Sequence, residues 1–244
     1  MINYNDLTQK TVAEVVSNNI KTAHVFKKYG IDFCCGGNVS IQKACENKNI
    51  DIATLYAEID ETIRKNAYVP SYETWPLPFL ITYIVNMHHA YVTESLHLLD
   101  QYVEKVVRVH GQNHPPLLEI KVLYQELANE MRQHMRKEEA VLFPYIQSLA
   151  AAQTSKQTPP TPPFGSISNP IGMMQTEHDA AGDICRKIAV LTQQYQPPIW
   201  ACNTFKALYA KLAEFEEDLH IHVHLENNIL FPKALLLEKQ VLSN

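Results

Sequence analysis

Glycine is scarce in this chain, and features typical of membrane-spanning or nucleic-acid-binding proteins are missing. Only seven of the 244 residues are glycine, too few for the many tight turns of an all-β fold. The sequence shows no bilayer-length apolar run and no basic segment leading into an apolar stretch at its start. The net charge is −5, without a basic tract that would follow a phosphate backbone. These absences predict a helical protein of the cytoplasm, with no membrane or nucleic-acid partner.

Cysteine occurs in an odd number, which argues against a secreted disulfide framework. There are five cysteines, and two of them, Cys34 and Cys35, are adjacent. A framework of paired bridges needs an even number, so we expect reduced thiols. Apolar residues make up 46% of the chain and charged residues 19%, and a chain of this length buries a core without covalent staples.

Residues 1–66 are predicted to form a small helical domain. Its helices are expected over residues 8–28, 40–48 and 52–65. Gly36-Gly37 marks the turn after the first of them, and Ser40 and Asp51 are suitable N-caps for the other two.

Residues 77–244 are predicted to form an all-α, up-and-down four-helix bundle. A linker over residues 67–76 precedes it, because the two prolines there disfavour helix. The expected helical segments are 77–110, 116–149, 170–194 and 198–238. A Pro- and Thr-rich connector at about 153–165 divides them into two helix pairs, which suits such a bundle.

A repeated motif is the most informative feature of the sequence. His134 and Glu138 are followed by Leu-Phe-Pro at 142–144, and His222 and Glu226 are followed by Leu-Phe-Pro at 230–232, with identical spacing. In a helix a His and a Glu four residues apart lie on one face and can bind one metal centre. Each pair falls on an apolar stripe, so both pairs are predicted to point into the core.

A buried carboxylate is costly unless its charge is compensated, and neither stripe carries a Lys or Arg that would compensate Glu138 or Glu226. A bound cation would do so. For one pair, an ordinary His–Glu contact on a helix surface is the simpler interpretation, worth a few tenths of a kcal/mol. Two matched pairs on core stripes favour the metal.

Each helix pair also carries a single histidine on its first helix. His88 lies 46 residues before His134, and His178 lies 44 residues before His222, and both share a face with apolar residues. A lone histidine on such a face is more often a core residue, but the repeat favours ligands. Four imidazoles and two carboxylates suit iron, manganese or zinc, and the absence of thiolates disfavours structural zinc. We therefore predict a pair of metal ions, with iron as the first choice.

Other polar residues are assigned by the same face criterion. His97, His220 and His224 are expected on solvent faces, and His89 stays ambiguous. No apolar stripe includes His24, His110 or His114. Two acids near the predicted ligands, Glu130 and Glu177, either orient a ligand or relay protons, or are ordinary solvated glutamates. Three cysteines are expected to be small core residues: Cys45, Cys185 and Cys202.

With these motifs, the chain resembles the hemerythrin-like di-iron proteins, and specifically the repair-of-iron-centres (RIC) family of iron–sulfur cluster repair proteins. The resemblance covers nearly the whole chain and includes Asp32-Phe33-Cys34-Cys35-Gly36-Gly37, both His-x3-Glu segments, and Glu177-His178-Asp179 with Gly182. It implies two iron ions bridged by the two glutamates and by an oxo or hydroxo group. The histidines that it implies as terminal ligands are His88, His134, His178 and His222.

The chain departs from the oxygen-carrying hemerythrins at Gly182, where they place another histidine. The missing imidazole leaves an iron open to nitric oxide or dioxygen, so reversible oxygen carriage is the weaker interpretation. The resemblance implies a stress protein that repairs damaged iron–sulfur proteins by iron donation or by nitric oxide chemistry. A gas sensor or carrier, and a metal-stabilised adaptor, are the alternatives.

An adjacent pair of cysteines before two glycines, Cys34 and Cys35, would be an unusual core element. Gly36-Gly37 leaves the backbone free to expose both sulfurs. We interpret them as a redox or metal-handling thiol pair. The oligomeric state stays open, with a homodimer allowed.

Overall fold

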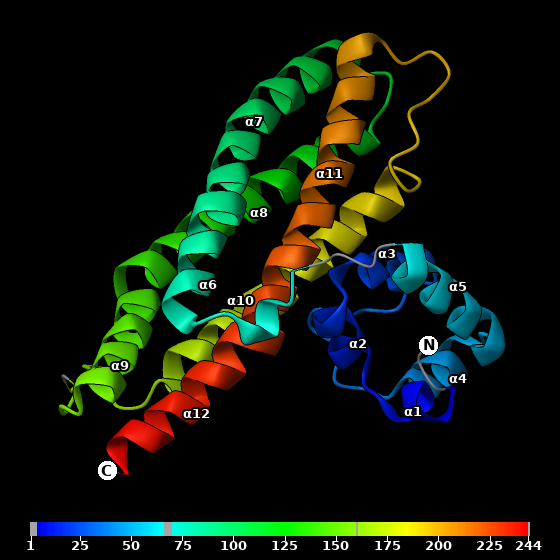
Figure 1. Cartoon of the computed structure of the whole chain (residues 1–244). Coiled ribbons are helices and arrows are strands. Elements are labelled where there is room, and N and C mark those ends of the chain that lie inside the picture. The colour runs from blue at the N-terminus through cyan, green and yellow to red at the C-terminus, as the bar shows by residue number, and fades with distance from the viewer. Residues whose placement is uncertain (1–3, 66–69, 160, 244) are drawn as a thin grey trace.

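The computed structural model describes residues 4–65, 70–159 and 161–243, and within these residues every regular element is a helix. A long helical bundle carries a small helical domain against its side (Figure 1). The predicted all-α fold class is therefore confirmed. Across the described residues, no helix combines the length and apolar character that crossing a bilayer requires.

Short helices make up the N-terminal domain. They are α1 (Tyr4–Gln9), α2 (Val12–Asn18), η1 (Ile20–Thr22), α3 (Ala23–Lys28), α4 (Ile41–Lys48) and α5 (Ile52–Lys65). The single helix predicted over 8–28 is wrong, because capping side chains interrupt it. Thr11 and Glu14 form a capping box that starts α2, and Asn19 accepts a hydrogen bond from the Lys21 N–H and starts η1. Ser40 caps α4 as predicted.

The bundle runs up, down, up and down along four long helical segments (Figure 1). After a short turn, η2 (Tyr72–Thr74), they comprise α6 (Leu77–Tyr83), η3 (Ile84–His89), α7 (Ala90–His110), α8 (Pro116–Lys137), η4 (Glu138–Leu142), α9 (Phe143–Ser155), α10 (Ser168–Leu191), α11 (Asn203–Leu225), η5 (Glu226–Leu230) and α12 (Phe231–Leu242). Within the bundle α7 packs along α11, and α8 packs along α10. Helix α9 extends to Ser155, slightly into the region predicted as connector.

Three of the four segments contain a wide π-helical turn. In η4 the Phe143 N–H donates to the Glu138 carbonyl five residues back, and in η5 the Phe231 N–H donates to the Glu226 carbonyl in the same way. The proline that follows each Phe lacks an N–H, and in a regular α-helix its ring would clash with the carbonyl four residues back. A wider turn relieves that clash. The repeated Leu-Phe-Pro thus places a π turn that begins at the glutamate of each His–Glu pair.

Two apolar clusters fill the molecule, one on each side of the predicted metal ligands. One contains residues of the N-terminal domain, such as Phe26 and Leu55, together with bundle residues such as Leu96 and Leu212. The other is built from the far half of the bundle, including Phe143 and Phe231. The N-terminal domain therefore shares its core with the bundle, and α2 contacts both α11 and η5.

Candidate metal centre

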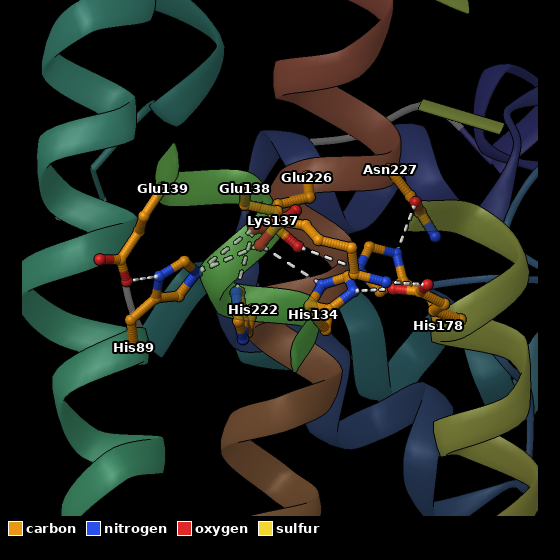
Figure 2. A network of polar contacts seen from close by, with 10 residues as sticks. His89, His134, Lys137, Glu138, Glu139, His178, His222, Glu226 and Asn227 are labelled. Carbon is orange, nitrogen blue, oxygen red and sulfur yellow. Dashed lines mark hydrogen bonds and ion pairs between the residues drawn. The ribbon is translucent and has the colours of Figure 1, made fainter. Parts of the chain in front are cut away.

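Six buried side chains from the four helical segments converge at the middle of the bundle. They form two groups of four, in which the ligand atoms lie within 4.8 Å of one another. The groups are His89, Glu138, His222 and Glu226, and His134, Glu138, His178 and Glu226. Both glutamates are fully buried and belong to both groups. Figure 2 shows the histidines arranged around this shared carboxylate pair.

The structure brings together five of the six predicted ligands and adds His89 in place of His88. The Nε2 atom of His89 lies 3.4 Å from Glu138 Oε2. His88 is buried outside both groups, where its Nδ1 lies 3.0 Å from Asp218 Oδ1 and its ring stacks on that of His222. Regular α-helical periodicity predicts that His88 faces the bundle interior. The π turn over η3 adds a residue to the turn, so that the next residue, His89, faces the interior instead. No sequence pattern marked that turn, because η3 has no proline.

The Nε2 atoms of the four histidines lie close to the carboxylate oxygens of Glu138 and Glu226. Glu138 Oε2 lies 3.3 Å from His134 Nε2, and Glu226 lies 3.2 Å from His178 Nε2 and 3.0 Å from His222 Nε2. Within the described residues, both oxygens of Glu138 and one of Glu226 are buried without a hydrogen-bond donor. Unpaired buried carboxylate oxygens facing imidazoles suit a shared cation, so the donor set fits a pair of metal ions.

Electrostatics within this cluster is dominated by the two carboxylates. Burial by itself lowers the pKa of His89 and His134, but Glu138 and Glu226 outweigh it and raise both values to about 10. Burial likewise opposes ionisation of Glu226, yet its histidine neighbours hold its pKa well below the ordinary value. Without metal, imidazolium protons therefore compensate the carboxylates, and a metal cation would replace them.

Three of the four candidate ligand histidines have a partner on their outer ring nitrogen. Nδ1 of His89 lies 2.7 Å from Glu139, Nδ1 of His134 lies 2.9 Å from Glu177, and Nδ1 of His178 lies 3.0 Å from Asn227. Such contacts fix the ring's tautomer and orientation. The hydrogen bond to His134, together with the Lys137 ion pair, lowers the pKa of Glu177 to about 2.

Of the two acids singled out from the sequence, Glu177 thus contacts the predicted ligand His134. For Glu130 the structure shows a different environment: its Oε2 is buried without a partner in the described part of the chain, and burial raises its pKa.

The loop that carries Cys34 and Cys35 docks directly on η5. Asn228 donates a hydrogen bond to the Cys34 carbonyl at 3.0 Å, and the Asn227 Nδ2 atom lies 3.9 Å from Cys35 Sγ. Cys34 is buried and Cys35 is half-buried, so the expectation that both sulfurs are exposed is wrong. Asp32 accepts hydrogen bonds from the backbone N–H groups of both cysteines, and its Oδ1 lies 3.3 Å from Cys34 Sγ.

Three other sequence assignments need correction, and the first is His220, whose ring packs edge-on against Phe33 and whose Nδ1 is buried rather than solvent-facing. His224 is fully buried rather than solvent-facing, with Nε2 3.3 Å from Ser17 Oγ and Nδ1 3.3 Å from the Phe33 carbonyl. The docked N-terminal domain covers that helix face, which the sequence of α11 alone does not reveal. Cys202 is exposed because it precedes α11 at the end of a surface turn, and its Sγ lies 3.3 Å from His110 Nε2.

At position 182 the structure leaves room beside α10. A Cβ atom added to Gly182 would meet only Arg186 Nη1, at 3.5 Å, so packing does not require glycine there. Because residue 182 is glycine, the site has no imidazole on the turn after His178.

Comparisons with known proteins agree with this architecture. Residues 80–234 match the hemerythrin HHE cation-binding domain, and residues 8–63 match the ScdA_N domain, a domain of unknown function. Similar proteins include the iron–sulfur cluster repair protein ScdA of Staphylococcus haemolyticus, 37% identical over 92% of this chain and 97% of the relative. The iron–sulfur cluster repair protein YtfE of Musicola paradisiaca is 36% identical over 93% of this chain and 96% of its own.

The YtfE protein of Yersinia pseudotuberculosis is 37% identical over 86% of this chain and 90% of its own. Both domains and nearly the full length are shared with these relatives. The chain therefore belongs to the ScdA/YtfE family of iron–sulfur cluster repair proteins, which is built on a hemerythrin HHE cation-binding domain.

Proposed function

We propose that this protein holds two iron ions and repairs iron–sulfur clusters damaged by nitrosative or oxidative stress, by donating iron from its di-iron centre. The observation that carries the proposal is the pair of fully buried glutamates shared by two groups of histidines. The names of the similar proteins supply the repair function, and damaged iron–sulfur proteins are then the partners.

In this proposal His89 and His222 would hold one ion, His134 and His178 would hold the other, and Glu138 and Glu226 would serve both. When bound, the ions supply Lewis-acid positions for small ligands and a store of exchangeable iron. The protein supplies the negative charge of Glu138 and Glu226, orients the imidazoles through their outer partners, and surrounds the site with apolar side chains.

Binding of nitric oxide or dioxygen is the second candidate activity, as a sensor or carrier or as part of repair. Gly182 favours it, because no imidazole occupies the turn after His178. The thiol pair fits the same proposal, since Cys35 contacts Asn227, which in turn holds His178. We propose that Cys34 and Cys35 act as redox or metal-handling thiols. Because all five cysteines are free, a reducing compartment such as the cytoplasm is the proposed location.

The central experiment measures iron per chain after purification without oxygen, followed by visible spectra before and after nitric oxide. We expect about two irons per chain and a spectrum that changes with the gas. His134→Ala should lower the iron content, whereas His97→Ala, at an exposed position, should not. Fewer than one iron per chain, unchanged in His134→Ala, would contradict the di-iron proposal. Transfer of the iron to a cluster-depleted acceptor distinguishes donation from gas binding alone.

A further inference from the structure

The two halves of the candidate centre are held unequally. Both carboxylates are shared, so the two metal positions differ in their histidines, in the residues that orient them, and in Gly182, which follows His178 by one turn. One position uses His134 and His178, and the other uses His89 and His222. Figure 2 shows the first pair lying close to Lys137 and Asn227, and His89 beside Glu139.

Both imidazoles of the first pair have a hydrogen-bond partner on Nδ1 that is itself held by another residue. Nδ1 of His134 lies 2.9 Å from Glu177, which is itself ion-paired with Lys137. Nδ1 of His178 lies 3.0 Å from Asn227 Oδ1, and the Nδ2 atom of the same amide reaches Cys35 of the N-terminal domain at 3.9 Å. Each ring is therefore fixed by a side chain that a second residue holds in place.

In the second pair, only His89 has such a partner among the described residues. Nδ1 of His222 is buried without a hydrogen-bond partner among the described residues, and its only parallel neighbour is the stacked ring of His88, 5.5 Å away. His89 is held by Glu139, whose side chain is 48% exposed and lines an open surface cavity of about 410 Å³. A solvated carboxylate loses more conformational freedom when it holds a ring, so Glu139 orients His89 at a greater entropic cost.

Partners of this kind are worth about 10- to 100-fold in metal affinity. We propose that the iron held by His89 and His222 is the transferable one and is released first, through the surface at Glu139. The iron held by His134 and His178 is retained longer. This inference rests on the proposed iron donation and names which of the two ions is donated.

Release kinetics test the order. Protein loaded with two equivalents of iron(II) without oxygen is mixed with excess ferrozine, and release is followed by absorbance. We expect two phases of equal amplitude whose rates differ by about tenfold or more. Zinc is then added after the fast phase, and anomalous scattering at the iron and zinc edges locates each metal in crystals. Zinc between His89 and His222 supports the proposal; zinc between His134 and His178, or a single release phase, overturns it.

Asparagine variants separate this inference from a general loss of structure. Asn227→Ala removes the brace of His178 and should accelerate the slow phase by about 10- to 100-fold, while Asn227→Asp keeps the acceptor and the slow phase. The matched control is Asn228→Ala, since Asn228 contacts the Cys34 loop and not His178. Acceleration of the fast phase alone in Asn227→Ala would overturn the assignment.

Iron content before the chelator is added distinguishes the two levels of the proposal. A chain that cannot hold two irons refutes the di-iron function itself. A chain that holds two and releases them at one rate refutes only the inequality of the positions.

Discussion

Metal binding at this site should release protons, and the number follows from the buried imidazoles. In the metal-free protein the pKa values of His89 and His134 are raised to about 10, so both rings are protonated at pH 7.5. A metal ion binds only the deprotonated nitrogen. Each ring must therefore lose its proton on binding, at a cost of about 3.4 kcal/mol for 2.5 pH units at about 1.36 kcal/mol per unit.

The sign of the pH dependence follows from the raised pKa values. Protons compete with metal below about pH 10, so the affinity for each ion should rise with pH, by up to about tenfold per unit, because each ion displaces one of the two protons. His222 should contribute no proton, because burial lowers its pKa and leaves it neutral.

Calorimetry measures the effect directly. Iron(II) is titrated without oxygen, between pH 6.5 and 8.5, in buffers of different ionisation enthalpy, and the dependence of the heat on the buffer counts the protons released. We expect about two protons from these imidazoles at pH 7.5, and about one fewer in His89→Ala. An affinity that stays constant across this pH range, or binding without proton release, would refute the reasoning.

Three further predictions concern single side chains. His89→Ala should lose about half of the bound iron while His88→Ala keeps nearly all of it, as measured by metal analysis, and the reverse order would restore the assignment of His88 as the ligand. Glu238→Ala should lower the free energy of unfolding by about 1–3 kcal/mol, because the Ile167 N–H and the Tyr145 hydroxyl lose their buried acceptor; urea unfolding tests this, and no change would show that water replaces the carboxylate. Thr11→Ala should cost about 1 kcal/mol by removing the α2 capping box, and Thr11→Ser should recover most of it.

Much of the site was readable from the sequence because its ligands follow helical periodicity. The repeated His-x3-Glu and Leu-Phe-Pro segments placed His134, Glu138, His222 and Glu226 on inward faces, and the structure brings all four together. Periodicity failed at His89, since a π turn without a proline changes the phase of the helix and leaves no trace in the pattern of apolar residues.

The short-range order of the N-terminal domain was only partly readable. Its N-cap at Ser40 was predicted correctly, but the capping box at Thr11 was overlooked, although its Thr and Glu three residues apart are visible in the sequence. That break divides the helix predicted over 8–28 into shorter ones.

The sequence by itself determined the helical class, and it predicted five of the six side chains that the structure brings together. These predictions depend on the spacing of residues along the sequence, which can be read without knowing the tertiary structure. Only the tertiary structure decided which of two adjacent histidines faces the carboxylates, and that His224 is buried. It also decided that Cys35 lies against the residue that holds His178. Those outcomes depend on helix phase and on the docking of one domain against another, and contacts between residues so distant in sequence have no local pattern.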